Sequence, residues 1–151
     1  GYLGQESQKL DVNLIANHFG KNTTCNLRAD GTLKDQAEKT FRGTIDFKKG
    51  CKGSVGAEQE NVLLLGEEIV NKTIPLILCA EEDVEGNHGA TIGKLDEDLV
   101  FYLESRGMAL AEIYKMMAKA RIDAVLRFVP DEKTKADVAS YLESEGSNGC
   151  K

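Results

Sequence analysis

The chain has 151 residues, and its 19 lysines and arginines against 25 aspartates and glutamates give a formal net charge of −6. This acidic balance disfavours nucleic acid and anionic membranes as partners, because both attract basic surfaces. The longest apolar run, 74–80, is far shorter than the roughly 20 residues that span a bilayer, and the N-terminus lacks a secretory signal pattern, so we expect a cytoplasmic protein.

Short strand patterns fill the first two thirds of the sequence. Apolar and polar residues alternate at 10–14 and at 44–47, whereas 62–65 and 74–79 are short continuous apolar runs. Glycines separate these segments, as tight turns between short strands require. The strand centres recur at a loosely regular spacing, which fits both an antiparallel sandwich and the coils of a β-solenoid. Periodicity alone leaves both alternatives open.

After residue 93 the hydrophobic period becomes that of helices. Three helices are predicted, at about 96–107, 109–129 and 131–145, from capping residues, apolar spacing and terminating glycine or proline. We therefore divide the chain into a strand-rich part, 1–93, and a helical part, 94–151.

Common catalytic motifs are missing from the sequence. The four cysteines, Cys25, Cys51, Cys79 and Cys150, form no CxxC pair, which argues against a zinc knuckle and favours free thiols. With two histidines, no GxSxG turn and no GxxxxGK[ST] loop, neither a Ser-His-Asp hydrolase nor a nucleotide-phosphate loop is supported.

His88 is the residue most suited to chemistry. It lies in a glycine-containing segment directly after the acidic residues Asp83 and Glu85, and an imidazole beside carboxylates can be a metal ligand, a base or a hydrogen-bonded hinge. One hypothesis is therefore a small metal-dependent hydrolase or lyase that uses these three side chains, although a catalytic metal usually takes about three protein ligands. Another is a β-solenoid interaction module that has no site.

A long motif carries a family resemblance. The stretch 84–97, with His88-Gly89-Ala90-Thr91 at its centre, continues into 101–107, which ends in Ser105-Arg106-Gly107. It resembles the C-terminal signature of the SufB/SufD family of iron–sulfur cluster assembly scaffolds. Shorter matches precede it in the order that this family shows, at 33–35, 41–45, 59–65 and 73–76. The resemblance covers about residues 10–129.

The resemblance implies a fold. We expect the last turns of a right-handed parallel β-helix followed by a small α-helical domain, so that the chain is mostly β with a helical C-terminal part. The choice between sandwich and solenoid then falls on the solenoid. Because full-length members of this family carry more β-helix, the chain looks like a SufD-like C-terminal fragment.

The resemblance also implies a function. Members of this family act as scaffolds and not as enzymes, and a SufC-type ABC ATPase that binds their helical domain supplies the ATP hydrolysis. A transient iron–sulfur cluster forms where two scaffold chains meet, the second chain here being a SufB-like partner or another copy of this one. We expect no cofactor to stay bound to this chain by itself.

Particular residues follow from the same resemblance. His88 matches the histidine that SufD-type members contribute to the scaffold interface, and it is the candidate metal ligand. Cys79 falls where SufB-type members have a cysteine, and Glu60 takes the place of the SufB-type cysteine proposed to receive sulfur or to hold the cluster. Glu60, together with Gly89 after His88, makes the site SufD-like.

A second group of residues is expected to bind the ATPase. Arg106 and Gly107 lie at the end of the signature, and Tyr114 and Met116 lie in the second predicted helix. Methionine and tyrosine suit adaptable protein interfaces.

Overall fold

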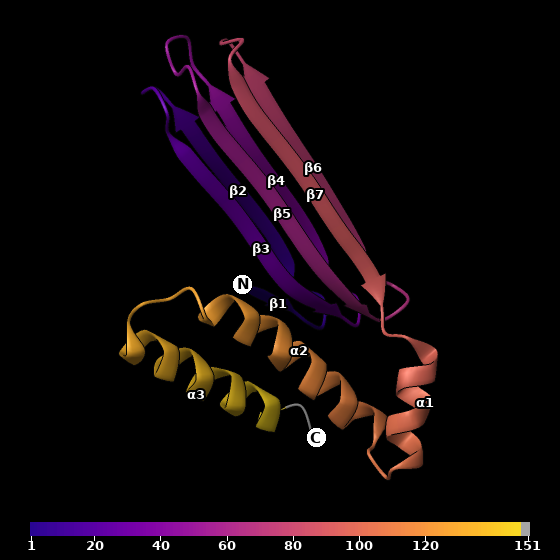
Figure 1. Cartoon of the computed structure of the whole chain (residues 1–151). Coiled ribbons are helices and arrows are strands. Elements are labelled where there is room, and N and C mark those ends of the chain that lie inside the picture. The colour runs from indigo at the N-terminus through magenta and orange to yellow at the C-terminus, as the bar shows by residue number, and fades with distance from the viewer. Residues whose placement is uncertain (149–151) are drawn as a thin grey trace.

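The computed structural model describes residues 1–148 and shows a parallel β-solenoid of about three turns followed by three helices (Figure 1). The strands are β1 (Tyr2–Gly4), β2 (Lys9–His18), β3 (Thr24–Lys34), β4 (Glu38–Phe47), β5 (Ser54–Leu65), β6 (Val70–Cys79) and β7 (Val84–Lys94). The helices are α1 (Glu97–Ser105), α2 (Leu110–Leu126) and α3 (Glu132–Asn148). The expected combination of a β-solenoid and a helical C-terminal part is confirmed.

The strands form two sheets in which every pairing is parallel. One sheet has the order β1-β3-β5-β7 and the other β2-β4-β6. Consecutive strands therefore lie in opposite sheets, and each strand pairs with the equivalent strand of the next coil. Glu38 of β4, for example, pairs with Lys9 of β2 and with Val70 of β6. This pattern is that of a solenoid and excludes the antiparallel sandwich.

Alternate side chains of the inner strands β4 and β5 fill the narrow interior between the two sheets. In β4 every second residue from Lys39 to Phe47 is buried, as the period of two in a strand requires. The interior tolerates little extra volume, because a Cβ at Gly56 would lie 2.7 Å from Ile45 Cγ2 and 3.0 Å from Phe47 Cζ. Glycine at this position allows the two sheets to approach.

An ion pair lies inside the solenoid. Lys39 Nζ donates to Glu60 Oε1, and the side chains of both residues are 0% exposed. Tyr2 donates its hydroxyl to Glu60 Oε1 at 3.0 Å, and Thr73 donates to Glu60 Oε2 at 2.6 Å. Burial lowers the pKa of Lys39 against the opposing effect of Glu60, and burial together with the Glu60 charge raises the pKa of Tyr2. Four strands therefore contribute to one polar network.

The helices attach to the solenoid mainly through α2. Its buried residues are Ile113, Ala118 and Ile122, and α2 packs against β3 at the end of the sheets where β7 leads into α1 (Figure 1). Helix α1 has no buried residue. Within residues 1–148 no helix combines the length and apolar character needed to cross a membrane.

The expected free thiols are confirmed where the structure describes them. Cys25, Cys51 and Cys79 form no disulfide, whereas Cys150 lies outside the described residues.

Replacing Lys39 with methionine should destabilise the solenoid strongly. The variant leaves the Glu60 carboxylate buried without its cation, which costs about 3–5 kcal/mol in comparable proteins. Urea unfolding followed by circular dichroism measures the loss. The double variant Lys39→Met, Glu60→Leu should recover part of it, because no unpaired charge is then buried. A single variant as stable as the parent protein would show that the pair does not hold the coils together.

Shortening Ile122 should loosen the attachment of the helices. Ile122 is buried and a Cβ at Gly1 would lie 3.3 Å from its Cδ1, so Ile122→Ala removes packing between α2 and the solenoid at a cost of about 2–5 kcal/mol. Hydrogen exchange should then accelerate in α2. Leu110→Ala, on the same helix but 40% exposed, is the matched control, and equal effects from both variants would contradict this attachment.

Candidate functional site

His88 lies on the inward side of the last coil. It belongs to β7, pairs in register with Glu58 of β5, and has the same orientation as Gly86, whose added Cβ would meet Ile77 and Phe47 in the interior. The side chain of His88 is 30% exposed whereas that of Glu58 is 0% exposed. Because β7 is the outermost described strand of its sheet, the imidazole is covered by β5 on one side and accessible on the other.

Glu58 is the buried partner of His88. Its Oε1 lies 3.9 Å from His88 Nδ1, and neither of its carboxylate oxygens has a hydrogen-bond partner among the described residues. Burial raises the pKa of Glu58, the His88 charge opposes this shift and the Glu60 charge adds to it. A Cβ at Gly43 would lie 2.3 Å from the Glu58 carboxyl carbon, so the glycine makes the space that the carboxylate occupies.

The sequence analysis did not identify Glu58. The available signal was its position two residues before Glu60, which places both side chains on the same side of a strand. Its proximity to His88 depends on the pairing of β5 with β7, whose residues are 30 positions apart at this point (88 − 58). Nothing local in the sequence indicates that register.

Glu60, predicted as a cluster-assembly position, lies in the interior network with Lys39. Both of its carboxylate oxygens already accept hydrogen bonds, from Lys39 and Tyr2 on one and from Thr73 on the other. It is fully buried. In this arrangement the carboxylate is paired inside the coil and is not presented to solvent.

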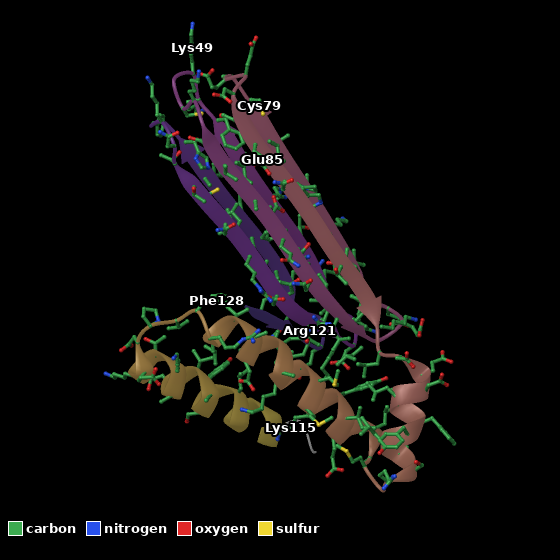
Figure 2. All side chains as sticks on the ribbon, viewed as in Figure 1. Lys49, Cys79, Glu85, Lys115, Arg121 and Phe128 are labelled. Carbon is green, nitrogen blue, oxygen red and sulfur yellow. The ribbon has the colours of Figure 1, made fainter. Side chains whose placement is uncertain are left out.

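Cys79 lies at the far end of the solenoid from the helices. Figure 2 shows it near the turn that carries Lys49, well away from Lys115 and Arg121 of α2. Its side chain is an exposed free thiol. His88 is four residues beyond Val84, the first residue of β7. With a rise of about 3.3 Å per residue in a strand, His88 lies about 13 Å from the turn that connects Cys79 to β7. The structure therefore does not bring these two candidate residues together on one ion.

The three residues of the metal-hydrolase hypothesis also point apart. Asp83 lies in the turn before β7, with its Oδ2 3.6 Å from Lys52 Nζ. Glu85 accepts a hydrogen bond of 3.0 Å from Asn87 on the side of β7 opposite to His88. Over residues 1–148 there is no group of three or more histidine, cysteine, aspartate or glutamate side chains that could hold a metal ion. That hypothesis thus lacks its donor set.

A histidine–cysteine contact occurs elsewhere in the solenoid. His18 Nε2 lies 3.1 Å from Cys25 Sγ, while His18 Nδ1 lies 2.6 Å from Thr23 Oγ1, and the ring stacks on Phe47 with centroids 4.8 Å apart. Burial raises the pKa of the Cys25 thiol, which disfavours the reactive thiolate. The contact therefore has the character of packing.

The expected ATPase-binding residues lie in and between the first two helices. Arg106 follows α1 and places its guanidinium 5.1 Å from the centre of the Tyr102 ring, and Gly107 has a φ of +91° that suits glycine. Met116 is exposed and Tyr114 half-buried. The structure adds large exposed apolar side chains that the sequence analysis did not assign to a surface: Leu99, Phe101 and Tyr102.

Comparison with known proteins identifies a family. Residues 1–121 match the family model described as SUF system FeS cluster assembly, SufBD core domain. The chain is 27% identical over 140 residues to the iron–sulfur cluster assembly protein SufD of Bacillus subtilis, covering 93% of this chain and 32% of that protein.

Two further relatives agree with this match. A SufBD family protein of Synechocystis is 26% identical over 148 residues, covering 97% of this chain and 31% of the relative. SufD of Escherichia coli is 27% identical over 119 residues, covering 79% and 28% respectively. The chain thus spans about a third or less of the length of these curated relatives. Since the family model extends over most of the chain, the protein belongs to the SufB/SufD family of SUF iron–sulfur cluster assembly proteins.

Proposed function

We propose that the protein is a scaffold subunit of the cytoplasmic SUF machinery for iron–sulfur cluster assembly and not itself an enzyme. The observation that carries this proposal is the match of residues 1–121 to the SufBD core domain. In this role the helices bind a SufC-type ABC ATPase, which hydrolyses the ATP. The cluster is transient cargo that forms where this chain meets a second scaffold chain, either SufB-like or another copy.

The position of His88 supports a role at a scaffold–scaffold contact. It lies on β7, and β6 and β7 are the outermost strands of their sheets over the described residues. The free backbone groups of an outer strand can pair with another chain. A second scaffold covering this coil would enclose His88, which is partly exposed here.

The donor groups of this chain favour a shared cluster. Iron–sulfur clusters are held mainly by cysteine thiolates, and among the described cysteines Cys79 is the exposed one, whereas Cys51 is buried and Cys25 half-buried. His88 and Cys79 are too far apart for one iron. The second scaffold would therefore supply further ligands, and Glu60 contributes through the stability of the coil.

The exposed apolar side chains of the helices support ATPase binding. Phe101 is 73% exposed and Tyr102 52% exposed on α1, a helix without any buried residue. Met116 on α2 is also exposed. Aromatic and methionine side chains of this kind are enriched in protein interfaces.

Met116→Glu should abolish co-purification of the protein with the SufC-type ATPase of its source organism. The substitution places a charge in the expected apolar interface, where it would be desolvated without a partner. Leu76→Glu on β6 is the matched control, because Leu76 is 47% exposed and Met116 42% exposed. The control should retain stoichiometric binding. Failure of the well-folded parent protein to bind the ATPase would favour an interaction module of another kind.

His88→Ala should lower the yield of cluster in anaerobic reconstitution with iron, sulfide and the scaffold partner, because a ligand at the shared contact is lost. The free energy of unfolding should change by no more than about 0.5 kcal/mol, as for other partly exposed residues without hydrogen bonds. Absorbance of the reconstituted complex measures the yield. Asn87→Ala, on the outward side of β7, is the control, and an equal yield from all three proteins would refute a role for His88.

A further inference from the structure

Two buried carboxylates on β5 have opposite surroundings. Glu58 and Glu60 are two residues apart on one side of the strand and both are buried. Glu60 accepts from Lys39, Tyr2 and Thr73, whereas both oxygens of Glu58 have no hydrogen-bond partner among the described residues. A buried unpartnered carboxylate is unfavourable and calls for a specific reason, such as a bound ion.

The space around the Glu58 carboxylate is shaped on two sides. Gly43 of β4 leaves room that a Cβ would fill, since that atom would lie 2.3–2.4 Å from the carboxyl atoms. On β7, His88 Nδ1 lies 3.9 Å from Glu58 Oε1, which is too long for a hydrogen bond. Residues of β4, β5 and β7 therefore surround the Glu58 carboxylate. It faces the partly exposed imidazole of His88 across a gap.

The gap is close to the width that one metal ion needs. Bonds of about 2.0–2.2 Å from a metal to imidazole nitrogen and to carboxylate oxygen allow the two atoms to be up to about 4.2 Å apart. The observed separation of 3.9 Å lies within this limit, and a small rotation of the partly exposed His88 side chain that brings the two atoms to about 3.4 Å would give the tetrahedral angle. Imidazole suits iron among other transition metals, and carboxylates ligate divalent cations.

We propose that Glu58 and His88 together bind one divalent cation of the ferrous type on the inward side of the last coil. Glu58 supplies the negative charge from the buried side, His88 supplies a neutral nitrogen, and water or the second scaffold chain occupies the remaining positions. The inference rests on the proposed function, because ferrous iron is the material from which the cluster is built. It assigns to Glu58 the ligand role that the sequence analysis gave to Glu60.

The charges near the site agree with a cation of this kind. The carboxylate of Glu60 is the other charged group that acts on Glu58 besides His88, and it is already neutralised by Lys39. A divalent ion would therefore meet one buried carboxyl group that has no internal cation. By ligating it, the ion would give both of its oxygens a counter-charge and tie β5 to β7.

Metal binding tests the proposal directly. The purified protein is titrated anaerobically with cobalt(II) alone, as a spectroscopic substitute for iron(II), and then with iron(II) alone, with calorimetry for affinity and visible absorption for the cobalt ligand set. Glu58→Gln and His88→Ala should each weaken cobalt binding at least tenfold. Glu85→Gln removes the same charge from the outward side of β7 and should bind as the parent protein does.

A further variant tests the geometry without removing a ligand. Gly43→Ala places a methyl group against the Glu58 carboxylate and should also weaken cobalt binding. Circular dichroism checks that all variants are folded, and Glu58→Gln should be at least as stable as the parent protein because it buries no charge. Cobalt should raise the melting temperature of the parent protein and not that of Glu58→Gln.

The outcomes separate this inference from the proposed function. Parent-like cobalt affinity in folded Glu58→Gln or His88→Ala would overturn the inference, as would an equal loss in Glu85→Gln, which indicates binding by surface charge. The test of the scaffold role by ATPase capture uses the helices and does not involve Glu58. Cobalt binding that depends on both ligands would therefore stand even if the ATPase did not bind, and the reverse combination would leave the scaffold role intact.

Discussion

The narrow interior between the two sheets constrains the whole protein. Each strand must place every second side chain in this space, and a shift by one residue would turn the apolar and paired residues outward. The network around Glu60 shows how exact the register has to be. Its members come from four strands, with Tyr2 on β1, Lys39 on β4, Glu60 on β5 and Thr73 on β6. The charge on Lys39 is tolerated in the interior because all these strands are aligned.

The same register brings three residues together at the last coil. Gly43, Glu58 and His88 belong to β4, β5 and β7. The position of each depends on how its strand pairs with the strand of the preceding coil. Glu58 and Glu60 show that chemically identical groups on one strand acquire different roles from their neighbours. The Glu60 carboxylate is paired with Lys39 inside the coils, and the Glu58 carboxylate, which has no internal cation, faces the imidazole.

The helices give the protein a second surface at one end of the solenoid. Helix α2 packs against β3 and has Ile113, Ala118 and Ile122 buried, whereas α1 has no buried residue and exposes large apolar side chains. Figure 2 shows Lys115 and Arg121 of α2 far from Cys79, which lies at the opposite end of the strands. A partner on the helices and a partner on the last coil can therefore bind to different parts of the molecule.

The sequence by itself determined the kinds of elements, because strands and helices follow from local periodicity. The resemblance of one contiguous motif pointed to the family and to the β-solenoid that precedes the helices. The sequence did not reveal that Glu60 is paired internally, that Glu58 faces His88, or that α1 has no buried side. Those features depend on pairing between coils: Glu58 and His88 meet through a register that joins residues 30 positions apart (88 − 58). Only the tertiary structure decided them, because burial and charge compensation arise from neighbours that are distant in the chain.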